Sequence, residues 1–356
     1  MTWISELETH FPRGQDAPLP HPAKTFFLCD KEKIIYAPVA KCACTSLKSL
    51  MLDLCELEQA ELIKKHGIHR VTNTFNTGAQ LKDIDYHAAR EVLTSENYYK
   101  FAVIREPIRR VISAYTEKFL RNRMVHDNKI CIQPVIQAVR ATPIADMEES
   151  ISFREFVEYI LRSDPLSLDS HWAPQYLALP GVDRYDDIFT TDQLHLLAQR
   201  LSQRTGKDVS LGKLNVSLKE ESSTADVEAG GLVDVLPREL DKVESITPEN
   251  FMHPDLIARL QTYYREDLEL YNHANAGQYS YEPDPVTLDD SPKVTNRPFD
   301  TIAEIARCIN IYSKGYFGLD SEGRAQLQVL IHNETGYPLN FGALEACALK
   351  YVIRDG

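Results

Sequence analysis

The chain has 356 residues, 43% of them hydrophobic, which is enough for one large domain or two with a substantial core. Its formal net charge of −13 argues against general nucleic-acid binding, because proteins of that class usually carry a basic face that neutralises phosphates. No apolar run is long enough to cross a bilayer, and the N-terminus lacks the basic start of a signal peptide, so we expect a cytoplasmic protein without a transmembrane segment.

The first ordered unit that the sequence predicts is a strand, a turn and a helix. Residues 1–23 form a polar leader, after which residues 33–36 favour a strand that Pro38 ends. Residues 41–46 are small or polar, and apolar residues then recur at helical spacing at Leu47, Leu50, Met51 and Leu54. The turn therefore lies at a helix N-terminus, where unpaired N–H groups and the helix dipole favour a phosphate or sulfate.

The side chains of this turn strengthen the prediction of an anion site. Lys41 adds a mobile positive charge, Thr45 and Ser46 add hydroxyl donors, and the small Ala43 lets the backbone approach a ligand closely. The turn has no glycine, and its hydroxyl residues do not follow the lysine directly, as they do in the Walker loop of nucleotide triphosphatases. We therefore predict a phosphate-binding loop that differs from an ordinary Walker loop.

Metal binding is not indicated by the cysteines and histidines near this unit. The chain has seven cysteines, an odd number, and Cys42 and Cys44 are too close in sequence for an easy disulfide, so we expect reduced thiols. Three histidines follow at His66, His69 and His87, and their spacing matches no ligand pattern. We expect them at surface or core positions and expect no metal cofactor.

A second strand, turn and helix begins at residue 101. Residues 101–104 are fully apolar, Arg105 stands at the carboxyl end of the predicted strand, and Pro107 suits the first turn of a helix. Arg105 would then lie at the sheet edge where ligands of open α/β folds bind, and Ser113 on the following helix can reach the same edge. Arg109 and Lys118 could attract an anion there, although a solvated helix face is the favoured interpretation.

The rest of the chain predicts further elements and a composition change. Residues 122–150 are polar and irregular with a helix at 135–140, and such an insertion suits acceptor recognition. Periodic segments predict a helix over 153–161, a strand over 186–190, a helix over 191–204 and a last helix over 254–272. Residues 283–299 have the composition of a linker, and residues 300–356 predict a small helical extension that could serve oligomerisation or partner docking.

The two units together resemble the two cofactor motifs of the sulfotransferases, specifically the carbohydrate sulfotransferase group that includes the chondroitin 4-O and HNK-1 enzymes. The first unit is similar to the 5′-phosphosulfate loop, with Ala40 in place of the family proline and with matches at Lys41, Ala43, Cys44, Thr45, Ser46 and Lys48. The second is similar to the 3′-phosphate motif, with Glu106 in place of Asp and with matches at Arg105, Pro107, Arg110, Ser113, Ala114 and Tyr115. Residues 169–175 and 264–271 resemble two later segments of the family in the same order.

The resemblance implies a sulfotransferase domain over residues 24–282, built on a P-loop-like, mostly parallel α/β sheet flanked by helices. It implies transfer of a sulfuryl group from 3′-phosphoadenosine 5′-phosphosulfate (PAPS) to an acceptor hydroxyl, most simply on a carbohydrate, without a metal. Lys41 would stabilise the charge on the leaving 5′-phosphate. The PAPS-binding residues would be Lys41, Cys42, Ala43, Cys44, Thr45, Ser46, Arg105 and Ser113.

The acceptor must lose a proton, and histidine is a usual base. His171 is the leading candidate because Asp169 could orient it and Trp172 could desolvate it, although both aromatic residues could instead serve packing. His87 is a second candidate, because some glycan sulfotransferases place a catalytic histidine in that segment.

Two other functions stay open at this stage. A catalytically silent protein that binds PAPS or its product is suggested by Ala40, which makes the turn less rigid. A P-loop-type nucleotide kinase would need a Lys-Ser/Thr pair that this turn lacks. Lipids, small metabolites and peptide tyrosines remain alternative acceptors, since a fold and a cofactor do not identify the acceptor.

Overall fold

The computed structural model describes residues 7–12, 22–179, 185–211, 228–241, 243 and 246–277. The predicted linker and C-terminal extension, and most of the predicted leader, lie outside these residues. No helix in the described part of the chain has the length and apolarity that crossing a bilayer requires.

A four-stranded sheet in the order β1-β2-β3-β4 forms the centre of the fold. The strands are β1 (Phe27–Cys29), β2 (Ile34–Ala37), β3 (Tyr99–Ile104) and β4 (Asp187–Thr190). β2 pairs with β3 and β3 with β4 in parallel, whereas the edge strand β1 is antiparallel to β2 and was not predicted. The mostly parallel α/β sheet is thus confirmed. Because parallel strands end at one edge, the loop after β2 and Arg105 after β3 come together.

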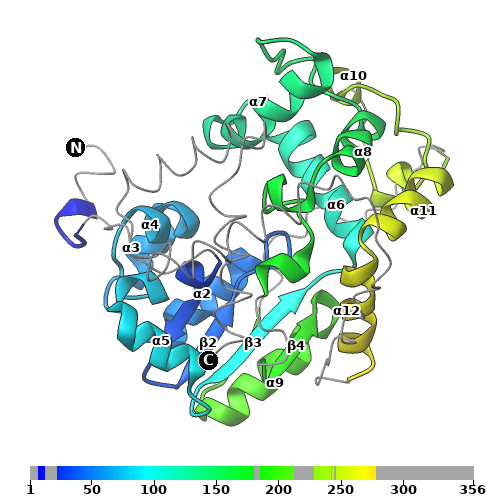
Figure 1. Cartoon of the computed structure of the whole chain (residues 1–356). Helices are drawn as coiled ribbons and strands as arrows, with labels where there is room; N and C mark the ends of the chain where they lie inside the picture. The colour runs from blue at the N-terminus through cyan, green and yellow to red at the C-terminus, as the bar shows by residue number, and fades with distance from the viewer. Residues whose placement is uncertain are drawn as a thin grey trace, which may run out of the picture.

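Helices from residues 44–94 and from residues 194–275 pack against this sheet (Figure 1). The sheet and these helices share one hydrophobic core, in which β2 is buried along its whole length. Such continuous burial is typical of parallel strands covered on both faces. The helices are α2 (Cys44–Leu54), α3 (Ala60–Lys65), α4 (Ile68–Thr74), α5 (Tyr86–Thr94), α9 (Leu194–Thr205) and α12 (Arg265–Asn275).

A second hydrophobic core lies among the helices beyond the carboxyl edge of the sheet (Figure 1). It is rich in aromatic rings: Phe119 lies 4.7 Å from Phe156 between ring centroids, and Phe156 lies 5.4 Å from the buried Trp172. Its elements are α6 (Pro107–Tyr115), the π-helix η3 (Thr116–Arg121), α7 (His126–Arg140), α8 (Phe153–Arg162), α10 (Pro237–Leu240) and α11 (Pro254–Tyr263). The 3₁₀ helices are η1 (Ala23–Thr25), η2 (Leu81–Asp83), η4 (Pro165–Ser167), η5 (Gln175–Ala178), η7 (Thr191–Gln193) and η8 (Pro248–Phe251).

Most predicted elements are confirmed, and two predictions were wrong. The helix predicted at 135–140 begins much earlier, because α7 starts at His126 and continues through Pro134. The predicted last helix is two helices, since the chain breaks at Tyr264 with φ −98° and ψ 28°. The Tyr264 hydroxyl donates to the backbone oxygen of Trp172, so a tertiary hydrogen bond fixes the break that helical periodicity does not show.

Candidate functional site

The loop between β2 and α2 is a tight turn with an unusual backbone. Lys41 has φ 69° and Ala43 has φ 57°, both in the left-handed region that non-glycine residues rarely adopt. Such residues cluster at functional sites, since each costs on the order of 1 kcal/mol or more. Ala43 is the N-cap of α2 and its side chain caps nothing, so no capping side chain competes for the first-turn N–H groups. The turn therefore lies at a helix N-terminus, as the sequence predicts.

Arg110 fixes the backbone of this loop. Its side chain is almost fully buried and donates from Nε to the Ala40 oxygen at 2.9 Å. Its other nitrogens donate to the oxygens of Ala173 and Ser170, both at 2.7 Å. Arg110 thus ties the loop to residues 169–175 and holds the backbone at Ala40, where the resemblance expects a proline.

Gln175 fixes the backbone of Arg105. Its Oε1 accepts from the Arg105 N–H at 2.9 Å, and its Nε2 donates to the Arg105 oxygen at 2.8 Å. The Cys42 thiol also donates to Oε1 at 3.1 Å, and burial raises the pKa of Cys42 to about 12, so this thiol is neutral and structural. The buried Asp267 accepts the N–H groups of Gln175 and Tyr176 at 2.7 and 3.0 Å. These contacts join four segments of the chain: the loop after β2, the residue after β3, η5 and α12.

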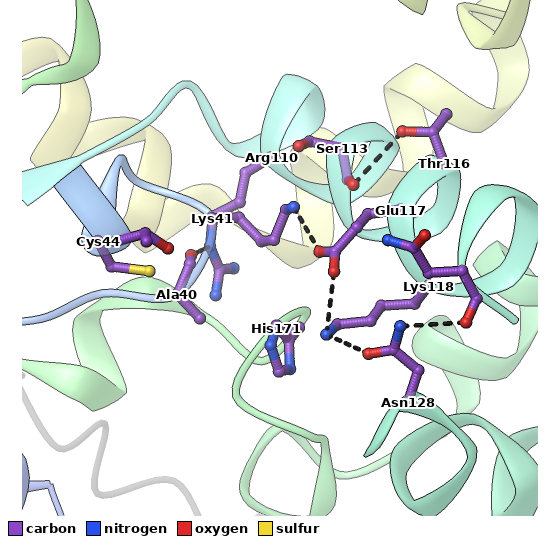
Figure 2. Close-up of polar contacts among 12 residues, drawn as sticks. Ala40, Lys41, Cys44, Arg110, Ser113, Thr116, Glu117, Lys118, Asn128 and His171 are labelled. Carbon is purple, nitrogen blue, oxygen red and sulfur yellow. Dashed lines mark hydrogen bonds and ion pairs between the residues drawn. The ribbon is translucent and has the colours of Figure 1, made fainter. Parts of the chain in front are cut away.

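Arg105 and Ser113 offer hydrogen-bond donors that the described residues leave unused. The guanidinium of Arg105 is half-buried, which lowers its pKa, yet no described residue makes an ion pair or hydrogen bond with it. Ser113 on α6 is 4% exposed, and its Oγ has no partner among the described residues (Figure 2). A buried hydroxyl without a partner costs free energy, so the pair indicates a place for an anionic ligand.

Lys41 is held by Glu117 in a partly buried ionic cluster (Figure 2). The Lys41 Nζ lies 2.7 Å from Glu117 Oε2, and the Lys118 Nζ lies 3.2 Å from Glu117 Oε1. Burial alone would raise the pKa of Glu117, but the two ammonium groups outweigh burial and lower it. Glu117 is therefore an ionised carboxylate, and it forms an ion pair with Lys41 when no other anion is bound there. The π-helix η3 places both Glu117 and Lys118 here.

The interpretation of Lys118 as part of a solvated face was wrong. Lys118 is 8% exposed, and its Nζ donates to Asn128 Oδ1 at 2.8 Å. Figure 2 shows this contact as a dashed line. Arg109 is exposed as expected and pairs with Glu249 at 3.3 Å. The start of α7, which was expected to be irregular, thus supports the site through Asn128.

His171 forms a pair with Asp169 and faces the same cluster (Figure 2). The ring Nδ1 lies 2.6 Å from Asp169 Oδ1, which also accepts the His171 backbone N–H at 2.9 Å. Burial would raise the pKa of Asp169, but these hydrogen bonds to His171 lower it. Since a carboxylate only accepts, Nδ1 carries a proton, so in the neutral ring the lone pair is on Nε2. The neighbouring Trp172 is a core residue, as its burial shows.

Of the other predicted site residues, those of the loop lie at the start of α2, whereas His87 lies apart from them. Thr45 and Ser46 lie in the first turn of α2 directly after the loop, and Cys44 begins that helix. His87 is exposed on α5, where its ring lies 5.6 Å from that of Tyr86, and no described contact joins it to Lys41 or His171. Sequence reasoning missed Glu117, Gln175, Asp267 and His69 as site residues.

His69 reaches the loop from α4. Its Nε2 lies 2.9 Å from Thr45 Oγ1 and its Nδ1 lies 3.0 Å from Lys48 Nζ. His69 is exposed, in line with the expected surface position, but its contacts with Thr45 and Lys48 were not predicted. Among the described residues, no group of three or more His, Cys, Asp or Glu side chains is arranged to hold a metal ion.

Comparisons with known proteins agree with this geometry. A sequence model described as the sulfotransferase family matches residues 24–274. The chain is 26% identical to human carbohydrate sulfotransferase 14 over 175 residues, which cover 48% of this chain and 44% of that protein. It is 29% identical to the zebrafish (Danio rerio) carbohydrate sulfotransferase 14 over 181 residues, 50% of this chain and 47% of the relative.

Human carbohydrate sulfotransferase 9 is 26% identical over 192 residues, which cover 52% of this chain and 42% of that protein. The chain thus spans less than half the length of these relatives. No solved structure matches the chain.

Proposed function

Because this chain belongs to the sulfotransferase family, we propose that it transfers a sulfuryl group from PAPS to a hydroxyl group of a carbohydrate. The observation that carries the proposal is the pair of anion sites at one sheet edge. The loop with Lys41 offers one site, and the unpartnered Arg105 and Ser113 offer the other. PAPS has two anionic groups, one at each end of its ribose, so two separate sites suit it.

The loop suits the 5′-phosphosulfate. The first-turn N–H groups of α2 and the Lys41 ammonium would lie against it, while Arg105 and Ser113 would bind the 3′-phosphate. The planar guanidinium of Arg105 suits donation to phosphate oxygens. The buried Ser113 hydroxyl would also donate to the 3′-phosphate and so gain a hydrogen-bond partner. The 3′-phosphate contacts distinguish PAPS from adenosine nucleotides that lack this group.

The transfer needs a base and a cation at opposite ends of the reacting group. His171 Nε2 takes the proton of the acceptor hydroxyl as that oxygen bonds to sulfur. The bond between sulfur and the bridging oxygen breaks, and its electron pair stays on the 5′-phosphate. Lys41 stabilises the charge that grows there.

The carbohydrate acceptor is supported by the names of the relatives, each a carbohydrate sulfotransferase. The test is to incubate the protein with PAPS and a panel of glycans, a tyrosine peptide and a lipid alcohol. Formation of 3′-phosphoadenosine 5′-phosphate (PAP) and of sulfated product would be followed by mass spectrometry. We expect sulfation of at least one glycan and of neither other acceptor. Sulfation of the peptide or lipid alone would overturn the assignment of the acceptor.

Glu117 competes with PAP for Lys41, so removing its charge should strengthen binding. The Glu117→Gln variant frees Lys41 and removes a carboxylate next to the anion. We expect PAP to bind about tenfold more tightly by calorimetry, which corresponds to about 1.4 kcal/mol. Glu91→Gln on the exposed face of α5 makes the same change in net charge and should leave affinity unchanged. Equal tightening in both variants would assign the effect to net charge rather than to the Lys41 pair.

A further inference from the structure

His69 is in direct contact with three residues of α2. Its Nε2 lies 2.9 Å from Thr45 Oγ1 and 3.9 Å from Cys44 Sγ, and its Nδ1 lies 3.0 Å from Lys48 Nζ. Thr45 is exposed in the first turn of α2. Lys48 is 5% exposed, and its Nζ lies 5.4 Å from the centre of the Phe27 ring. The histidine therefore joins the surface of the anion loop to a buried lysine.

The contact with Lys48 decides which ring nitrogen of His69 carries the proton. A lysine ammonium has only donors, so Nδ1 must accept from it. Although part of His69 is exposed to solvent, burial of its ring lowers its pKa, and the Lys48 charge lowers it further. The ring is thus neutral near pH 7, and its proton lies on Nε2.

A proton on Nε2 determines what the Thr45 hydroxyl can do. The hydroxyl accepts from Nε2, which occupies a lone pair and leaves the Thr45 proton free to be donated to another group. Thr45 follows Cys44 at the start of α2, among the N–H groups that face the anion site. The free hydroxyl proton is therefore available to an anion in the loop.

We infer that His69 is a positioning residue that directs the hydroxyl proton of Thr45 to the 5′-phosphate end of PAPS. This inference rests on the proposed function. The competing role is purely structural: His69 would serve only as an acceptor for the buried Lys48. Two substitutions separate these roles, because asparagine places an amide near the position of Nδ1 and glutamine places one near the position of Nε2.

The test measures PAP affinity by calorimetry for His69→Asn, His69→Gln and Thr45→Val. His69→Asn keeps an acceptor for Lys48 but loses the donor to Thr45, so we expect about tenfold weaker binding. His69→Gln keeps the donor to Thr45 and should stay within about threefold of the unchanged protein. Asparagine binding as well as glutamine, or better, would overturn the inference and assign His69 to Lys48.

A double-mutant cycle with Thr45 provides the second test. If His69 acts through the Thr45 hydroxyl, His69→Asn has no further effect once Thr45→Val has removed that hydroxyl. The same tenfold loss in both backgrounds would contradict the inference. His10→Asn, at an exposed histidine, serves as the control and should bind as the unchanged protein does.

Failure of the inference and failure of the proposed function look different. If the unchanged protein does not bind PAP, both are overturned. If it binds PAP and His69→Asn binds equally well, only the role of His69 is overturned.

Discussion

Replacing Lys41 with alanine is expected to lower kcat by about two to three orders of magnitude. The structure holds Lys41 at the turn before α2, in a backbone conformation with φ 69° and with its ammonium 2.7 Å from the Glu117 carboxylate. This ammonium carries the formal positive charge of the loop. We therefore expect it to stabilise the negative charge that grows on the leaving 5′-phosphate. The rate of PAP formation from PAPS under saturating acceptor measures the effect.

The matched control for Lys41 is Lys31→Ala. Lys31 is an exposed lysine that pairs with Glu56, so its loss removes the same charge and should change kcat little. A Lys41→Ala variant whose KM for PAPS rises while kcat is unchanged would show equal binding of the ground and transition states. That result would contradict the catalytic role of Lys41.

Replacing His171 with asparagine is expected to lower kcat by about two to four orders of magnitude and to leave PAP affinity unchanged. Asp169 orients the ring through Nδ1, so Nε2 is the atom that can take the acceptor proton. The rate of PAP formation under saturating acceptor, measured beside calorimetry with PAP, tests both expectations.

The control for His171 is the exposed His10→Asn, which should keep the rate. An unchanged kcat in His171→Asn would contradict the role of His171 as the base and would mean that another group takes the proton.

The alternative of a catalytically silent protein rested on Ala40, and the structure weakens its physical basis. Arg110 holds the Ala40 oxygen at 2.9 Å, so a buried side chain fixes the turn that a proline would otherwise stiffen. The His171–Asp169 pair is also assembled in the same cluster as Lys41. A protein that only binds PAPS does not need this histidine–carboxylate pair.

The parts of the site that follow from local patterns could be predicted from the sequence. An apolar strand followed by a turn and an amphipathic helix places Lys41 and Arg105 at strand ends, and parallel pairing brings those ends together. His171 and Asp169 could be paired because they are two residues apart in the chain.

The remaining site residues depend on contacts between distant segments. Glu117 faces Lys41 because η3 is a π-helix, whose extra residue per turn shifts side chains away from the positions that α-helical spacing predicts. Gln175 hydrogen-bonds the backbone of Arg105, and Asp267 accepts the backbone N–H of Gln175. Both residues come from segments far along the chain, and their polar side chains give no periodic signal. The contacts of His69 join α4 to α2, and the spacing of histidines along the chain does not reveal them.

The most direct test of the account is a calorimetric titration of the protein with PAP and with AMP, repeated on Arg105→Ala. The account predicts that PAP binds about a hundredfold more tightly than AMP, because the buried donors of Arg105 and Ser113 bind only the 3′-phosphate. Arg105→Ala should lose most of this preference while its affinity for AMP stays the same. Equal binding of PAP and AMP by the unchanged protein, or a preference that survives in Arg105→Ala, would contradict the assignment of the 3′-phosphate site.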